Sequence, residues 1–197
     1  MSIRALVALV GLIAVPDIAT AQHGGEAPSN TSAPAEASQF NFLIGQWELE
    51  VKPKATTLAM RIHGVPKLQG TWKAWRALDG WGVVDELRIA DASGNPLSLT
   101  HFVRVFDMPA RRWSISALNV YRATYTLSTA QWQENELRTS AFAIVADGKP
   151  ALSRVRITNV TPNGFRYRQD RSTDGGRTWT ADILVMEAKR TAATATR

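Results

Sequence analysis

Charged side chains placed between apolar ones are the residues of this chain most capable of orienting a ligand. Arg76, Asp85 and Arg104 each lie two residues from apolar neighbours, so on a strand each shares a face with them. If such a face points into a barrel, the charges must pair with one another or with a ligand carboxylate, because an unpaired buried charge costs several kcal/mol. If it points outward, the charges are solvated. Both alternatives stay open for Arg76 and Asp85, whereas solvation is favoured for Arg154 and Arg156.

An acid–base pair in the same cavity would support catalysis. Asp85 with His101, or Asp85 with Tyr121, could serve as acid and base in a cofactor-free isomerase, cyclase or lyase. The chain has no Gly-x-Ser-x-Gly turn, so a serine nucleophile gains no support. The sequence leaves it uncertain whether the protein is an enzyme.

Aromatic side chains would supply the apolar wall of a binding cavity. The chain has seven Trp, six Phe and three Tyr, although most aromatic residues of a β-barrel belong to its core. We therefore combine a subset of them with the three charged residues. The predicted ligand-binding residues are Arg76, Asp85, Arg104, Trp75, Trp113, Tyr121 and Tyr167.

The histidine and cysteine content argues against a metal site. His23, His63 and His101 lie far apart, and the chain has no cysteine. Paired imidazoles or thiolates, the usual ligands of transition metals, are therefore missing from the pattern. We expect no metal and no cofactor, and a core that holds without disulfides.

The first 21 residues are typical of an export signal. Arg4 precedes an apolar run that ends near Ala19-Thr20-Ala21, the small-x-small pattern of a cleavage site. The run is too short to span a bilayer, which needs about 20 residues. We expect a signal peptide over 1–21, a periplasmic or secreted protein, and no transmembrane segment after cleavage.

Composition divides the remaining chain. Residues 22–38 are small, polar and proline-containing, which predicts a disordered linker, and 191–197 predict a disordered tail. The domain is expected over 39–190. The net charge is +6, with basic residues spread along the chain. Together with export, this indicates attraction to anionic surfaces and no nucleic-acid partner.

Alternation of apolar and polar residues with a period of two predicts that the domain is all-β. Connections after residue 69 are short, so neighbouring strands should pair antiparallel. Closing the sheet removes its edges, so we expect a closed antiparallel up-and-down β-barrel of about ten strands. Residues 53–67 break the pattern and predict a loop or short helix. The predicted strands cover 40–51, 69–78, 81–90, 97–107, 112–120, 124–133, 136–146, 151–160, 165–171 and 178–188.

Residues 40–47 read Phe-Asn-Phe-Leu-Ile-Gly-Gln-Trp, which resembles the opening of lipocalin-like (calycin) barrels. The fuller pattern Phe-x-Phe-Leu-x-Gly-x-Trp-x-x-Glu resembles the DUF1579-type group of lipocalin-like bacterial exported proteins. Further similarities are Gly-Thr-Trp at 70–72, Asp-Glu at 85–86 and Arg-Val-Phe-Asp at 104–107. The resemblance covers most of 40–190 and implies a small barrel with an internal cavity, often for an apolar ligand.

The resemblance also implies how the barrel floor closes. In lipocalin-like barrels the Gly-x-Trp tryptophan lies at the floor, and a basic side chain from the last strand lies on its ring. Trp47 matches that tryptophan, and Lys189 and Arg190 are the candidates for the basic side chain. Haem-binding members of the superfamily need an axial histidine near the chain end, and this sequence has none there.

Residues 172–179 match the Asp-box consensus once. A propeller would repeat the motif every 40–50 residues or so, and it does not recur here. The single copy therefore predicts a structural hairpin turn.

These patterns lead to one main hypothesis and two alternatives. The first is a barrel that binds a small apolar or amphipathic molecule, with Arg76, Asp85 and Arg104 orienting its polar end. The second is the cofactor-free enzyme described above. The third is a protein-interaction module whose basic surface docks an anionic partner. The sequence leaves the oligomeric state open.

Overall fold

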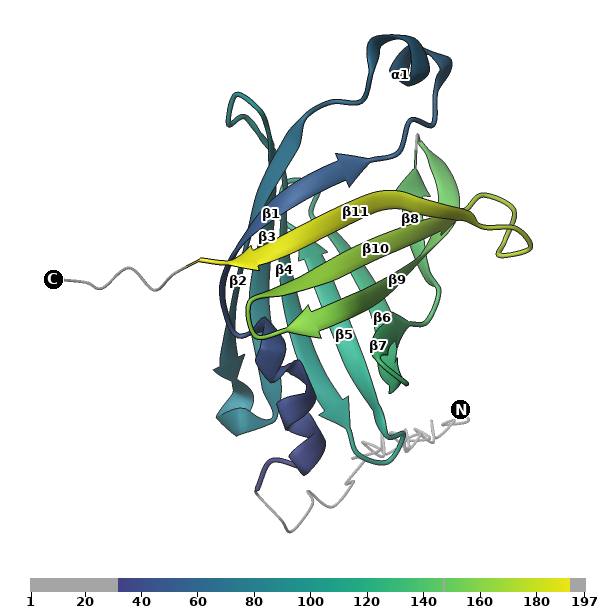
Figure 1. Ribbon diagram of the computed structural model, residues 1–197. Coiled ribbons are helices and arrows are strands. Elements are labelled where there is room, and N and C mark those ends of the chain that lie inside the picture. Colours follow the sequence, from purple (N-terminus) through teal and green to yellow (C-terminus); the bar gives the residue numbers. More distant parts are fainter. Residues whose placement is uncertain (1–31, 147, 192–197) are drawn as a thin grey trace, which may run out of the picture. The chain divides into compact units, whose positions relative to one another are not determined.

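The computed structural model describes residues 32–146 and 148–191 (Figure 1). The predicted signal peptide lies outside these residues, as do most of the predicted linker and all of the predicted tail except Thr191. Within the described part of the chain, no helix has the length and apolar character needed to cross a membrane.

Strands dominate the described chain, with two 3-10 helices (η1 and η2) and one short α-helix. The elements in chain order are η1 (Ala35–Leu43), β1 (Gly45–Pro53), α1 (Leu58–His63), β2 (Leu68–Ala77), η2 (Leu78–Gly80), β3 (Gly82–Asp91), β4 (Pro96–Asp107), β5 (Arg112–Asn119), β6 (Thr124–Gln133), β7 (Glu136–Thr139), β8 (Phe142–Ala146), β9 (Lys149–Thr161), β10 (Gly164–Ser172) and β11 (Thr180–Arg190).

The strands form a ring in which every pairing is antiparallel. Each strand from β1 to β7 pairs with the next, β7 pairs with β9, and β9, β10 and β11 follow in order. The last strand then returns to the first, with Trp47 opposite Arg190. This confirms the predicted closed antiparallel up-and-down barrel, in which closure leaves β1 and β11 without free edges.

The ring is interrupted at one position, between β7 and β8. The single strand predicted over 136–146 breaks at Ser140, and its second half, β8, pairs with β9. At the break the Ser140 N–H donates to the Thr129 carbonyl at 2.8 Å, and the Thr129 N–H donates to Ser140 Oγ at 3.0 Å. Among the described residues, β6 has no ladder with β8 beyond these bonds, so the two strands diverge there.

Alternate residues of the strands face the interior, as the period of two predicts. In β1 the side chains of Trp47, Leu49 and Val51 are buried and those between them are exposed. Trp72 and Trp113 are also large, fully buried side chains of the core. The core therefore consists of the inward faces of the ring.

The helix η1 closes one end of the barrel (Figure 1). The strand predicted over 40–51 is wrong in its first part, since Phe40 and Leu43 belong to η1 and are fully buried. The Phe40 ring packs edge-on against Trp113 at 4.6 Å. Apolar residues at consecutive positions cannot all face one side of a strand, and a helical turn buries them together. The last four residues of the predicted linker, 35–38, also belong to η1.

The helix α1 lies at the opposite end of the barrel from η1 (Figure 1). The Thr57 hydroxyl caps its start by accepting a hydrogen bond from the Met60 N–H at 3.2 Å. Gly64, at φ +85°, ends it in a conformation that favours glycine. A short helix was one of the two predictions for 53–67, and none of its residues is buried.

The turn between β10 and β11 has the hydrogen bonds of a self-contained hairpin. Ser172 Oγ accepts from the Gly176 N–H at 2.9 Å, and the Asp174 carboxylate accepts from the Thr178 N–H and hydroxyl. The Thr178 side chain and backbone lower the pKa of Asp174 to about 2. Trp179 Nε1 donates to the Gly176 carbonyl at 3.1 Å. The Asp-box motif is thus accounted for by the turn itself.

Candidate functional site

Asp85 and Arg104 form an ion pair inside the barrel. Arg104 Nε lies 2.6 Å from Asp85 Oδ2, and Arg104 Nη2 lies 3.0 Å from Oδ1. Trp72 Nε1 donates to the same Oδ1 at 2.7 Å. Asp85 is fully buried and Arg104 nearly so. Of the alternatives left open by the sequence, both charges face inward and pair with each other.

Aromatic rings enclose this ion pair. The guanidinium carbon of Arg104 lies 4.7 Å from the centre of the Phe102 ring and 5.0 Å from that of Phe40. Cations are attracted to ring faces, more strongly where water is excluded. With three hydrogen bonds on the Asp85 carboxylate, the pair is a satisfied unit at the floor of the site and does not present a free base.

Tyr167 lies beside this floor. It pairs across the sheet with Ile157 and Met186, which face the interior, and its ring centre is 6.0 Å from that of Trp72. Burial raises the pKa of Tyr167 well above its usual value, although the positive charge of Arg104 acts in the opposite direction. The hydroxyl makes no hydrogen bond with any described residue, so it can donate or accept one.

The half of the interior toward α1 is open to solvent. In the half nearer η1, the inward side chains of Trp72, Trp113 and Phe165 are buried. Several inward side chains farther along the strands are partly exposed, although Val51, Ser153 and Val155 stay buried. We call this open half the cup, which is lined by Ile89, Phe102, Ala117, Ser128, Tyr167, Gln169 and Leu184.

The structure separates the predicted acid–base pairs. His101 faces outward, with its Nδ1 3.7 Å from Glu86 Oε1, because neighbours on a strand point to opposite faces and Phe102 points inward. Tyr121 lies in the exposed turn after β5. Neither His101 nor Tyr121 meets Asp85, so both predicted catalytic pairs are wrong. Trp75, predicted as a wall of the cavity, also faces outward, 6.3 Å from the His101 ring.

Two further predicted ligand contacts instead hold η1 in place. Arg76 Nη1 donates to the Ala37 carbonyl at 2.7 Å, and its Nη2 contacts Asn41 Oδ1. Trp113 Nε1 donates to Gln39 Oε1 at 2.9 Å. Both side chains therefore act at the closed end, away from the cup.

The floor contact implied by the resemblance is confirmed for Arg190. Its guanidinium carbon lies 4.0 Å from the centre of the Trp47 ring. The same guanidinium donates to the carbonyls of Phe42, Ile44 and Pro162 at 2.7–3.0 Å. Lys189, the other candidate, is exposed. Trp47 and Arg190 are thus structural and lie outside the cup.

The arginines predicted to be solvated lie on the outer wall. Arg154 Nε and Arg156 Nη2 contact the Asp170 carboxylate at 2.9 and 3.4 Å. Burial alone would raise the pKa of Asp170, but the Asp182 N–H and the two guanidinium groups hold it below its usual value. Two guanidinium groups thus share one carboxylate on the outer wall.

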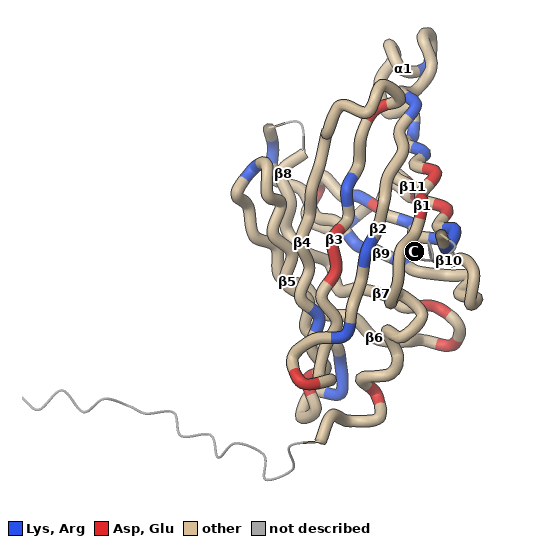
Figure 2. The backbone as a smooth tube through the Cα atoms, turned by 90° about the vertical axis from the view of Figure 1, so that its left-hand side faces the viewer, with Lys and Arg blue, Asp and Glu red and all other residues tan. Residues whose placement is uncertain are grey.

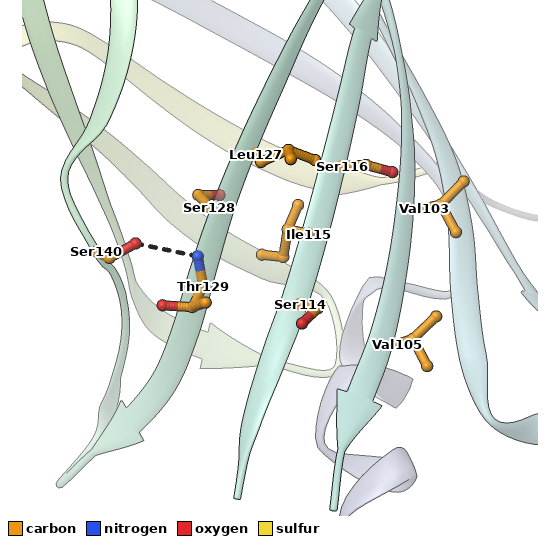
Figure 3. A pocket seen from close by; sticks show the side chains of 9 residues that line it. All are labelled: Val103, Val105, Ser114, Ile115, Ser116, Leu127, Ser128, Thr129 and Ser140. Atoms are coloured by element: carbon orange, nitrogen blue, oxygen red, sulfur yellow. Dashed lines mark hydrogen bonds between the residues drawn. The ribbon is translucent and has the colours of Figure 1, made fainter. Parts of the chain in front are cut away.

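A groove of about 410 Å³ lies against β4, β5 and β6. Figure 3 shows its lining of small hydroxyl and aliphatic side chains, with the Thr129–Ser140 hydrogen bond at one side. Its lining residues include no titratable side chain. The groove therefore has no acid, base or charged group for chemistry.

Of the predicted ligand contacts, Tyr167 alone lies in the cup, with Asp85 and Arg104 beneath it. Gln169 and Leu184, which pair with each other across β10 and β11, were not among the predicted contacts. Gln169 could have been found because it is two residues after Tyr167 and thus on the same face of the strand.

The raised pKa of Tyr167 predicts a pH dependence of stability. Because its pKa is raised in the folded protein, its contribution to the free energy of unfolding is complete below about pH 10 and is lost as the pH rises further. Above that pH, the Tyr167 hydroxyl should lower the free energy of unfolding by about 1.4 kcal/mol for each pH unit, and we expect this decrease to be absent in Tyr167→Phe. Urea unfolding at several pH values above and below this point measures it. Parallel profiles for the two proteins would contradict it.

No protein-family model and no curated protein matches the chain. The solved structures that resemble it include the S-type phycobiliprotein lyase from Guillardia theta. That structure shares 11% identity, with a TM-score of 0.49 over 79% of this chain and 92% of that chain. At these values the similarity carries no argument about function, and the fold is established by the strand pairing itself.

Proposed function

We propose that the protein binds a small amphipathic molecule in the cup. The observation that carries this proposal is the contrast between the two halves of the interior: the half nearer η1 is filled with buried side chains, whereas several inward side chains of the half toward α1 are partly exposed to solvent. An open, partly apolar concavity with a few polar groups is the usual form of a small-molecule site.

The lining of the cup suggests how such a molecule would lie. Its apolar part would contact Phe102, Ile89 and Leu184, and burial of apolar surface would supply most of the binding free energy. Its polar end would meet the Tyr167 hydroxyl and the Gln169 amide, which offer both donors and acceptors. The Asp85–Arg104 pair would support the floor beneath the polar end, since its charges already satisfy each other.

Binding is favoured over catalysis by the positions of the titratable groups. A general acid or base must reach the reacting atom, and a carboxylate that is tied in three hydrogen bonds is poorly suited to that role. We also propose, from the sequence patterns, that the protein is exported and related to the DUF1579-type group.

Filling the cup provides the test. Ala117 faces the cup opposite Phe102, and Ser116, its neighbour, faces outward. We expect Ala117→Leu to weaken binding of the apolar anionic fluorophore anilinonaphthalene sulfonate about tenfold, because added methylenes take up the ligand's space. Ser116→Leu adds a comparable side chain outside the cup and should leave binding unchanged. Fluorescence titration measures both affinities.

The native fold of each variant is checked by its far-ultraviolet circular dichroism and thermal unfolding. If both variants retain full fluorophore binding, or lose it equally, the cup is not the site and the proposal fails.

A further inference from the structure

Exposed apolar side chains gather at the α1 end of the barrel. We define the rim as the loops 54–67, 92–95, 120–123 and 173–179 with the strand ends that adjoin them. Leu58 and Ile62 are 72% and 67% exposed, and Tyr125, at the start of β6, is 73% exposed. Leu97, Val65, Val120 and Tyr121 are further exposed apolar side chains of the rim. Contact between these apolar side chains and water is unfavourable, and a bound partner would remove it.

The helix α1 carries the most prominent of these side chains. Leu58 and Ile62 are four residues apart and therefore lie on the same face of the helix. None of the residues of α1 is buried, so these side chains do not pack on the barrel. Their exposure is not explained by the core of the protein.

Basic side chains surround the exposed apolar ones. Lys54, Arg61 and Lys67 lie in the loop that contains α1, and that loop has no acidic residue (Figure 2). Asp91, at the end of β3, accepts a hydrogen bond from Asn95, and Asp174 accepts one from Thr178, while Asp182, near the start of β11, pairs with Arg168. The other end of the barrel carries several acidic residues: Glu36, Asp79, Asp107, Glu134 and Glu136. That end also carries basic residues such as Arg111, Arg112 and Arg138, so both signs of charge are mixed there, whereas the charged side chains of the loop that contains α1 are all basic.

We propose that the rim docks onto an anionic lipid surface. Leu58 and Ile62 enter the boundary between headgroups and acyl chains, while Arg61 and Lys67 contact lipid phosphates. A second copy of this chain would bring two basic rims together, which like charges oppose. The exposed apolar side chains come from three segments of the rim, namely the loop that contains α1, the start of β4 and the turn between β5 and β6, which suits a fluid surface better than a shaped protein partner.

Docking in this orientation turns the mouth of the cup toward the membrane. The inference goes beyond the proposed ligand binding, because it concerns the outer surface and is measured without any ligand. Failure of either proposal therefore leaves the other intact.

Co-sedimentation with vesicles tests the lipid surface directly. We expect the full-length protein to bind phosphatidylcholine vesicles that contain about one-quarter phosphatidylglycerol, and to bind pure phosphatidylcholine vesicles at least about tenfold more weakly. Binding to the anionic vesicles should fall steeply between about 20 and 500 mM salt. Equal binding to both vesicle types, or no binding to either at low salt, overturns the proposal.

A pair of variants tests the apolar contacts. Leu58→Ser with Ile62→Ser should weaken vesicle binding about tenfold or more, since two apolar side chains no longer enter the lipid. Leu78→Ser with Met108→Ser removes two exposed apolar residues at the closed end and should have no effect. Equal losses in the two variants would show that docking does not use the rim.

A second pair tests the charges. Arg61→Glu with Lys67→Glu should lower anionic vesicle binding about tenfold or more. Lys73→Glu with Arg112→Glu makes the same change in net charge at exposed positions outside the rim, and should lower it far less. If both variants lose the same fraction of binding, net charge alone explains the attraction and the docking surface is wrong.

Discussion

Replacing Asp85 with Ala is expected to lower the free energy of unfolding by about 3–5 kcal/mol. The substitution leaves the Arg104 guanidinium buried among Phe40, Phe102 and Trp72 without a counter-charge. It also removes the acceptor of the Trp72 Nε1 hydrogen bond. An uncompensated buried charge is among the most destabilising changes that a single substitution can make.

Urea unfolding followed by tryptophan fluorescence measures this loss. Glu86→Ala is the matched control, because Glu86 is the next residue of β3 and its side chain faces solvent. Its effect should stay within about 0.5 kcal/mol. A loss below about 1 kcal/mol for Asp85→Ala would show that the ion pair does not stay buried in solution.

The double variant Asp85→Leu with Arg104→Met separates charge from packing. Apolar residues of similar volume often replace a buried ion pair at little cost, because the desolvation of two charges is avoided. We therefore expect the double variant to recover most of the stability lost in Asp85→Ala. If the double variant lost as much stability as the two single substitutions together, a direct coupling between the two side chains would be contradicted.

Replacing Arg190 with Ala is expected to lower the free energy of unfolding by about 2–4 kcal/mol. The guanidinium donates to three carbonyls and covers the Trp47 ring, so one side chain joins η1, β1, the loop before β10 and the end of β11. Its loss removes charged hydrogen bonds and exposes an aromatic face at the same time.

Two comparisons make this prediction specific. Lys189→Ala changes the neighbouring basic residue, which is exposed, and should cost less than about 0.5 kcal/mol. Arg190→Lys keeps the charge but lacks the planar set of donors, so it should recover part of the stability. Unfolding in urea ranks the three variants, and near-ultraviolet circular dichroism reports the packing of Trp47. Equal stabilities for the Ala variants at 189 and 190 would contradict the role of Arg190.

Much of this fold could be predicted because alternation is a local property of the chain. In β1, for example, buried and exposed residues follow one another as the sequence indicates. The start of the domain could not be predicted in the same way. Phe40 and Leu43 look like strand residues, and only their packing beneath the barrel explains why they form η1. Likewise, nothing in the local sequence marks the break at Ser140. Before it the chain pairs with β6 as β7, and after it the chain pairs with β9 as β8.

The candidate site was predictable in part. Alternation placed Asp85 and Arg104 on faces with apolar residues, but which face points inward depends on the whole ring. Once Arg104 is known to be inside, His101 must be outside. The two residues are three positions apart, and positions that differ by an odd number lie on opposite faces of a strand. Tyr121 lay between two predicted strands, so its position could not follow from alternation at all.

The pairing of β1 with β11 also has a consequence for how the chain must be completed. Until the last strand is in place, β1 and β10 each keep an edge with unpaired backbone groups. Such edges pair readily with strands of other molecules. A chain that ended before Thr180 would therefore form an open sheet in which β1 and β10 have unpaired edges, and it would tend to polymerise through them. The final strand, held by Arg190, is thus what covers the edges of β1 and β10.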